Sequence, residues 1–159
     1  MKALPQLLAE DIHQFDGELR DLLEKTNSSA ALIVDQGGFV ITSQSKAQEF
    51  DLTTIGALAS GTYLANQTIA SLVQDEGFDC VYQRGEKFSM LIIAVGEYCL
   101  MVVIFKATVG VGAVKYFTEP VARRLTRNLE AAQARNPGLS LDLSALNLAD
   151  PSQVFKKNT

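Results

Sequence analysis

The sequence predicts an α+β fold in which one antiparallel sheet carries helices on both faces. Helical and strand-like apolar periodicities follow one another in the order helix, strand, strand, helix, strand, strand, strand, helix. Residues 87–95 and 98–105 carry apolar side chains at odd and even positions alike, which is typical of central strands covered on both sides. Short turn-forming segments separate consecutive strands, which favours hairpins and therefore antiparallel pairing.

A helix and a hairpin are expected at the amino-terminal end. Apolar residues recur every three or four positions over residues 4–25, which indicates an amphipathic helix that Gly17 weakens modestly. Two strands follow at residues 30–34 and 39–42. The segment between them, residues 35–38, reads Asp-Gln-Gly-Gly and contains residues that tolerate the positive φ angles of a tight turn.

A long helix without charged side chains is predicted next. It follows a polar loop at residues 43–50, and Asp51 is expected to cap its first turn. The helix runs to about Gln74, and no Lys, Arg, Asp or Glu occurs between Asp51 and Asp75. Its many Ser, Thr, Asn and Gln residues make this window too polar to span a membrane.

The third strand is expected to lie at a sheet edge or at an interface. Over residues 77–84, Phe78, Cys80 and Tyr82 alternate with mostly polar positions, so one side of the strand is more apolar than the other. The two central strands come next, joined by a tight turn at Gly96-Glu97.

The last helix is predicted to begin or to kink strongly near Thr118-Glu119. Apolar positions recur helically through this region, but Pro120 has no N–H to donate and its ring crowds the preceding turn. Asn136-Pro137-Gly138 ends the helix. The chain therefore divides into one domain over residues 1–138 and a tail over residues 139–159. The apolar residues of the tail leave two alternatives open, contact with a partner or folding back onto the helices of the domain.

Composition and charge indicate a soluble globular domain and argue against several classes of protein. The 159 residues are 47% hydrophobic and 20% charged, and the net charge of −4 argues against a general surface for nucleic acid or anionic membranes. No apolar run approaches the roughly 20 residues of a membrane-spanning helix, and the first residues lack the pattern of a secretory signal. We therefore expect a cytoplasmic protein without membrane insertion.

Few residues point to catalysis or to cofactor binding. His13, the single histidine, is expected on a helix surface without a matching nucleophile. Cys80 and Cys99 lack zinc-ligand spacing and are interpreted as packed strand cysteines. Gly110-Val111-Gly112 lacks the third glycine of a dinucleotide-binding loop. A solvated helix face is favoured over a surface for an acidic partner at Arg123, Arg124 and Arg127. The sequence thus predicts a non-catalytic protein with no metal and no cofactor.

The uncharged helix carries the strongest functional signal. One side of it is assigned to the core beneath the helix, namely Ile55, Leu58, Thr62, Ala65, Ile69 and Leu72. The opposite side, which we call the outer stripe, consists of Thr53, Ala57, Ser60, Leu64, Gln67 and Ser71, with Gly56 and Gly61 alongside. A solvated helix normally carries charges, whereas interface cores are depleted of them, so we interpret the outer stripe as a protein interface rather than as part of a fully buried helix.

Several of these segments together resemble the Roadblock family. The likeness covers about residues 10–130 and is carried by the element order, the hairpin at residues 31–40, the helix at residues 51–73 with its Leu58-Ala59-Ser60-Gly61, and the strand at residues 100–105. Within the family, the chain is most similar to the bacterial MglB regulators of the Ras-like GTPase MglA. The resemblance implies a profilin-like three-layer sandwich with a five-stranded antiparallel sheet in the order αββαβββα.

The resemblance also implies a function. It implies a homodimer in which the helices at residues 51–73 pair and the strands at residues 77–84 join, with Phe78, Cys80 and Tyr82 on the joining strand. It implies that a Ras-like GTPase in its GTP form docks on the same surface and hydrolyses GTP faster, in bacterial polarity or gliding motility, with recruitment to a cell pole through partners. The implied contact residues are Ala57, Ser60, Gly61, Leu64, Gln67 and Thr68.

Two other functions remain as alternatives. One is a dimeric Roadblock adaptor that binds without activating a GTPase. The other is a small-ligand sensor domain, which would need an internal pocket, whereas the apolar content of both central strands indicates a filled core.

Overall fold

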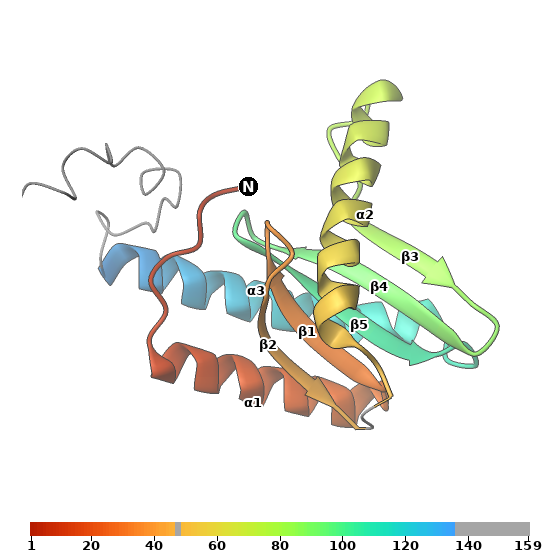
Figure 1. Cartoon of the computed structure of the whole chain (residues 1–159), viewed down its shortest axis with the longest axis horizontal. Coiled ribbons are helices and arrows are strands. Elements are labelled where there is room, and N and C mark those ends of the chain that lie inside the picture. The colour runs from red at the N-terminus through yellow and green to blue at the C-terminus, as the bar shows by residue number, and fades with distance from the viewer. Residues whose placement is uncertain (47–48, 136–159) are drawn as a thin grey trace, which may run out of the picture.

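The computed structural model describes residues 1–46 and 49–135, so the tail at residues 139–159 lies outside the described residues. Eight elements follow the predicted order (Figure 1). They are α1 (Ala9–Thr26), β1 (Ala30–Asp35), β2 (Val40–Ser45), α2 (Leu52–Leu72), β3 (Cys80–Arg84), β4 (Phe88–Val95), β5 (Cys99–Lys106) and α3 (Val111–Arg135).

The strands form one five-stranded sheet in the order β2-β1-β5-β4-β3, and all neighbouring strands are antiparallel. The helix α2 crosses one face of the sheet, while α1 and α3 cover the other (Figure 1). This arrangement is a three-layer sandwich and confirms the predicted fold class. The edge strands are β2 and β3.

Two apolar cores explain why both central strands carry apolar side chains on both of their faces. Successive side chains of a strand point to opposite faces, so Leu91 and Val103 pack toward α1 and α3, while Ile92 and Val102 pack toward α2. The first core is the larger and includes Phe15 and Leu125 from the two helices. The strand β5 is the central strand of the sheet, with β1 and β4 on either side, and it is covered on both faces.

Besides the start of α3, three boundaries differ from the prediction by three or more residues. The helix α1 begins at Ala9, where the carboxylate of Asp11 caps the first turn by accepting the Leu8 N–H at 2.7 Å. The strand β2 extends to Ser45, which pairs with Ala30. The strand β3 begins only at Cys80.

The prediction that the last helix begins near Thr118-Glu119 is wrong, because α3 runs from Val111 to Arg135 with Pro120 inside it. Buried side chains on both sides of the proline, Val114 and Val121 among them, hold the helix against the sheet. The hydroxyl of Thr118 donates to the Val114 carbonyl at 2.7 Å. Tertiary packing therefore outweighs the local cost of the proline.

Two ion pairs tie α1 to α3. The Arg124 guanidinium donates to both carboxylate oxygens of Glu18 at 2.9 and 2.7 Å. Arg135 donates likewise to Asp11 at 3.2 and 2.5 Å. Hydrogen bonds from Arg135 and from the Leu8 N–H lower the pKa of Asp11, although burial of the carboxyl acts in the opposite direction.

Because the pKa of Asp11 is lowered on folding, its ionised form stabilises the protein above about pH 4, and this contribution is lost as the pH falls through the folded-state value. Asp11→Asn should therefore lower the free energy of unfolding at pH 7 by about 1 to 2 kcal/mol. Urea unfolding at a series of pH values measures the difference. It should shrink below pH 4, and a difference that stays constant would contradict this role of Asp11.

Candidate functional site

Two glycines let the amino-terminal half of α2 lie directly on the β1–β2 turn. A Cβ atom at Gly56 would lie 2.9 Å from Val34 Cγ1 and 3.0 Å from Val40 Cγ2. Gly38 has a φ of +85°, and a Cβ there would lie 2.8 Å from the Cα of Ala57. The Ser60 hydroxyl adds a hydrogen bond to the Gln36 carbonyl at 3.0 Å. Gly56 therefore faces the sheet and does not lie alongside the outer stripe as predicted.

The first turn of α2 is held by Asp51, as predicted. One carboxylate oxygen accepts the Thr54 N–H at 3.1 Å, and the other accepts the Thr54 hydroxyl at 2.6 Å. These bonds lower the pKa of Asp51. The cap fixes where α2 starts, and its 21 residues then extend about 31 Å.

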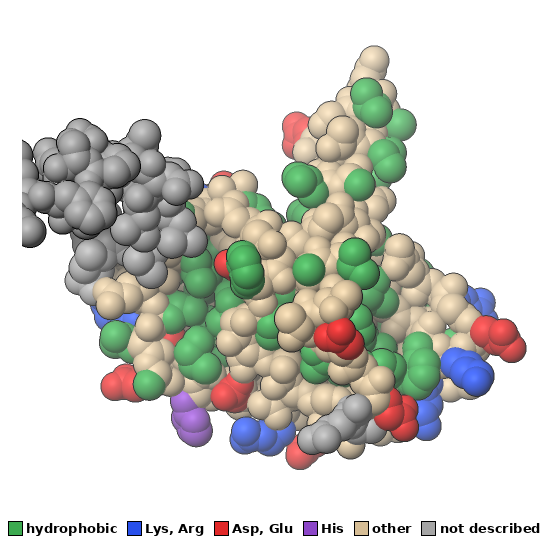
Figure 2. Space-filling view, in the orientation of Figure 1, with side chains coloured by type: hydrophobic (Ala, Val, Ile, Leu, Met, Phe, Trp, Pro, Cys, Tyr) green, Lys and Arg blue, Asp and Glu red, His purple; other side chains and the backbone are tan. Residues whose placement is uncertain are grey.

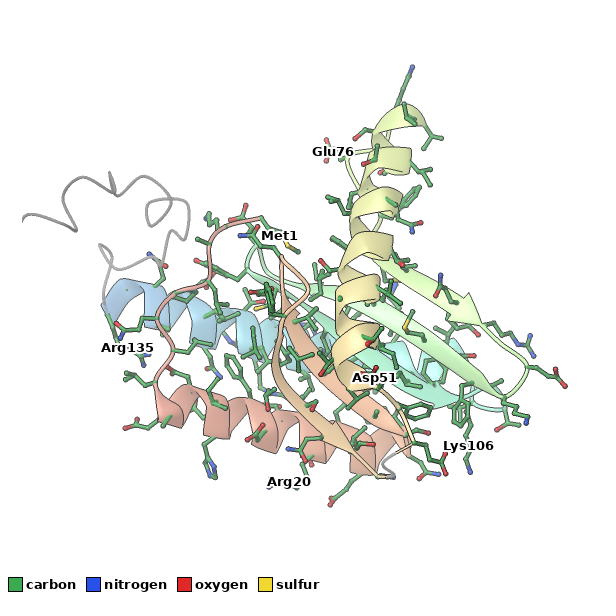
Figure 3. All side chains as sticks on the ribbon, viewed as in Figure 1. Met1, Arg20, Asp51, Glu76, Lys106 and Arg135 are labelled. Atoms are coloured by element: carbon green, nitrogen blue, oxygen red, sulfur yellow. The ribbon has the colours of Figure 1, made fainter. Side chains whose placement is uncertain are left out.

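The carboxyl-terminal half of α2 projects beyond the edge of the sheet (Figure 1). Figure 3 shows Asp51 at the base of the helix and Glu76 near its far end, past the strands. Leu64, Ile69 and Leu72 are 69%, 48% and 78% exposed, and hydrophobic side chains line this projecting half in Figure 2. The projecting half of α2 therefore exposes an apolar surface that the described residues leave uncovered.

The prediction of which α2 residues face the core is therefore largely wrong. Leu58, Ala65, Ile69 and Leu72 are exposed. The residues that face the sheet are Gly56 and Ala59, which are buried, with Leu52 and Tyr63 half-buried beside them. A helical wheel ranks the sides of a helix by polarity, but it does not register that the sheet supports only part of the helix.

The residues of the outer stripe, together with the implied contact residue Thr68, divide into two groups in the structure. Ala57, Gly61, Leu64 and Thr68 are exposed, as are Thr53 and Ser71. A Cβ atom at Gly61 would meet nothing within 4 Å, so a second backbone has room to approach there. Ser60 and Gln67 are half-buried and turn inward, with the Gln67 amide donating to the Phe78 carbonyl at 2.9 Å. The exposed group is accessible to a partner, and its role in binding stays a prediction.

Hydroxyl groups on the exposed side of α2 bond back to their own helix. Thr62, Thr68 and Ser71 donate to the carbonyls four residues earlier at 2.9, 3.1 and 3.3 Å. A polar group that is already hydrogen-bonded loses less when water is removed from it. The uncharged surface of α2 can therefore be covered at low desolvation cost.

Two hollows flank α2 on its own face of the sheet. One, of about 450 Å³, brings together Ser60, Leu64 and Gln67 with Tyr63, beside the β4–β5 turn and Met1 (Figure 3). Burial, with a smaller contribution from Asp79, raises the pKa of Tyr63, so its hydroxyl is neutral at pH 7 and can donate a hydrogen bond. Three predicted contact residues thus share one hollow.

The second hollow, of about 360 Å³, lies beside the amino-terminal end of α2 and is mostly apolar. It is lined chiefly by Phe50, Ile55, Phe88, Met90 and Ile104. Because these side chains come from four separate segments, no local pattern in the sequence indicates this groove. It opens next to β3, at the uncovered part of the sheet.

The strand β3 has a neighbour on one side only among the described residues. Tyr82 is partly exposed and stacks on Phe105, with ring centroids 6.3 Å apart, and Cys80 is half-buried. Phe78 lies before the strand, so the prediction that it belongs to β3 is wrong. An exposed edge of this kind can pair with another strand.

The residues considered for catalysis are placed as packed or surface groups. His13 is exposed on α1, and Gly112 lies in the first turn of α3. Cys80 and Cys99 are free, and burial raises the pKa of Cys99 to about 12, so that thiol stays protonated at pH 7. In residues 1–46 and 49–135 no group of three or more His, Cys, Asp or Glu is placed to hold a metal ion.

No helix among the residues that the structure describes is both long enough and apolar enough to cross a membrane.

One helix on one face of the sheet and two on the other, with a long uncharged α2, define a Roadblock-type domain. The Roadblock/LC7 domain family matches residues 15–105, more than half of the chain, and the chain belongs to this family. The structure is similar to one described as MglB with tetrameric arrangement, at 25% identity and a TM-score of 0.76, over 83% of this chain and 99% of that one.

A second similar structure is the gliding protein MglB from Thermus thermophilus, at 25% identity and a TM-score of 0.75, over 82% of this chain and 99% of that one. Profilin from Schizosaccharomyces pombe shares the fold, at 16% identity and a TM-score of 0.52, over 70% of this chain and 95% of that one. No curated protein sequence matched the chain. The predicted family, the MglB-like branch and the profilin-like architecture are thereby confirmed.

Proposed function

We propose that this protein is a non-catalytic, homodimeric regulator that binds the GTP form of a small Ras-like GTPase and stimulates GTP hydrolysis. The observation that carries the proposal is the exposed, uncharged surface of α2, which has its polar groups bonded internally and its apolar groups facing outward. The similarity to MglB structures supports it. A cytoplasmic location and recruitment to a cell pole through partners are part of the same proposal.

The shape of one chain supports a dimer with antiparallel α2 helices. The projecting end of α2 exposes Ile69, Leu72 and Val73, and the apolar groove of Phe50, Ile55 and Met90 lies beside the opposite end. If a two-fold axis pairs β3 of one chain with β3 of the other, the two α2 helices lie antiparallel. The projecting carboxyl-terminal end of each α2 then lies against the groove beside the amino-terminal end of the other α2. Both apolar features are then covered together.

In such a dimer the two α2 helices form one continuous surface for the GTPase. Ala57, Gly61, Leu64 and Thr68 are exposed on it, while Ser60 and Gln67 border it. The helix α2 has no Lys or Arg, so this surface has no arginine finger to insert into a GTPase. Stimulation therefore acts by ordering the switch loops and catalytic residues of the GTPase itself.

The protein is expected to sediment as a dimer at micromolar concentration, since a monomer leaves the projecting half of α2 and the β3 edge in water. Sedimentation velocity measures this directly. A single species of about the chain mass, 17.2 kDa, over the whole concentration range would contradict the dimer.

The regulatory activity is tested with each small Ras-like GTPase encoded in the same genome. Single-turnover GTP hydrolysis is measured with and without the protein, together with binding of the GTP and GDP forms. Faster hydrolysis supports the proposal. Selective binding of the GTP form without acceleration would instead identify an adaptor, and no binding to any of them would overturn the proposal.

A further inference from the structure

A second groove lies on the opposite face of the sheet from α2, between α1 and α3. The two helices run antiparallel, as their ion pairs at Glu18–Arg124 and Asp11–Arg135 require. Two adjoining hollows, of about 790 and 400 Å³, share Asp21, Lys25 and Arg124 and together follow the two helices. The combined feature, which we call the α1–α3 groove, extends from Asn128 to Tyr116 along α3.

The α1–α3 groove presents uncompensated positive charge. Its acidic side chains are already paired, Glu18 with Arg124, Asp21 with Lys25 and Glu119 with Lys115. Arg123 and Arg127 are exposed at the groove and make no ion pair or hydrogen bond with the described part of the chain. An anionic ligand would therefore meet two free guanidinium groups.

Exposed aromatic side chains and a helix glycine with free space beside it also line the α1–α3 groove. Tyr116 is 73% exposed and packs edge to face against Phe117, with ring centroids 5.2 Å apart, beside Pro120. Gly17 lies in the groove in the middle of α1, where a Cβ would meet nothing within 4 Å. Packing inside the domain thus gives no reason for glycine, an unfavourable residue in a helix interior. A missing side chain at this point leaves room for a bound segment.

The segment that matches this groove is in the same chain. Residues 139–155 carry five leucines, Val154 and Phe155, together with two aspartates, Asp142 and Asp150, and no Lys or Arg. Apolar side chains suit the exposed aromatic rings, and the aspartates suit Arg123 and Arg127. The segment therefore complements the α1–α3 groove both in apolar character and in charge.

The distances also match. Arg135 follows Tyr116 by nineteen positions in α3, a rise of about 29 Å. Residues 139–148, if extended, reach about 33 Å. The connecting sequence Asn136-Pro137-Gly138 has a composition that favours chain reversal, which would direct the segment back along α3. The length of chain after Arg135 is therefore sufficient to reach the whole groove.

We propose that residues 139–155 dock in the α1–α3 groove of their own chain, with their leucines against Tyr116 and Phe117 and with Asp142 facing Arg127. A partner that recognises this segment must then displace it from the groove. Because the groove and the α2 surface lie on opposite faces of the sheet, this proposal and the proposed GTPase regulation can fail independently.

Paramagnetic broadening in the full chain tests the docking. A nitroxide is attached to Ser144→Cys in a Cys80→Ser background, where the buried thiol of Cys99 is protected from labelling. Amide signals of Gly17, Tyr116 and Asn128 are expected to lose intensity, and that of Ala57 on α2 is expected to keep it. Equal intensities at all four positions would overturn the proposal.

Charge reversal provides the matched comparison. The double variant Arg123→Glu, Arg127→Glu should restore the lost intensities while the domain stays folded by circular dichroism, since both side chains are exposed and unpaired in the described structure. Arg20→Glu reverses an exposed arginine of α1 outside the groove and should leave the broadening intact. Persistent broadening in the double variant would contradict the proposed contacts.

An experiment on a mixture of two differently labelled chains distinguishes docking within one chain from docking between chains. Isotope-labelled chain without nitroxide is mixed with unlabelled chain that carries it. Unbroadened signals are expected. Broadening at Gly17 in this mixture would place the segment in the groove of a second copy and would overturn docking within the chain.

Discussion

Gly56→Leu is expected to lower the free energy of unfolding by about 3 kcal/mol, because α2 lies too close to the sheet to admit a side chain. The Cβ alone would lie 2.9 Å from Val34 Cγ1 and 3.0 Å from Val40 Cγ2. Both valines are held in paired strands, so α2 must move away and lose its contacts with the second core. Urea unfolding measures the loss.

Gly61→Leu is the matched control on the same helix. A Cβ at Gly61 meets nothing within 4 Å, and leucine is a better helix former than glycine, so the folded chain itself should not be destabilised. Any loss that comes from a weakened dimer depends on protein concentration, whereas the loss in Gly56→Leu does not. Equal, concentration-independent losses in both variants would contradict the close packing at Gly56.

Leu64→Arg is expected to weaken binding of the GTP-loaded partner by at least about 100-fold while leaving the fold intact. Leu64 is 69% exposed, so its replacement removes little from the core. Desolvating an unpaired guanidinium in an interface costs several kcal/mol, and each 1.4 kcal/mol corresponds to about tenfold in affinity. Titration of the partner, circular dichroism and sedimentation report binding, fold and dimer separately.

Ala59→Arg is the control for the buried side of α2. Ala59 is 2% exposed and belongs to the core beneath the helix, so the same charge should unfold the domain there. Helical periodicity suggests Ile69 for this control, but Ile69 is 48% exposed, and Ile69→Arg is expected to fold. Normal partner binding by a folded Leu64→Arg protein would exclude α2 as the docking surface.

Elements whose signals are local could be predicted from the sequence. Strands β4 and β5 carry apolar side chains on both faces, the β1–β2 turn contains residues suited to positive φ, and Asp51 supplies its own capping carboxylate. Each of these features depends on a few neighbouring residues, so the sequence specifies it directly. The absence of charge on α2 can also be read directly from the sequence, and it identified the candidate surface.

Features that depend on the position of another element could not be predicted. The helix start expected near Pro120 is absent, because packing of Val114 and Val121 against the sheet outweighs the missing hydrogen bond. The groove of Phe50, Phe88 and Met90 combines segments that are distant in the sequence. Such sites exist only once the chain has folded.

The order of the elements, the double-sided core and the lack of charge on α2 follow from the amino-acid sequence alone, because periodicity and side-chain chemistry are properties of the local chain. Which side of α2 meets the sheet, and where the sheet ends beneath it, depends on how the elements pack together. Gly56 is buried and Ile69 exposed because burial depends on the reach of the supporting surface as well as on polarity.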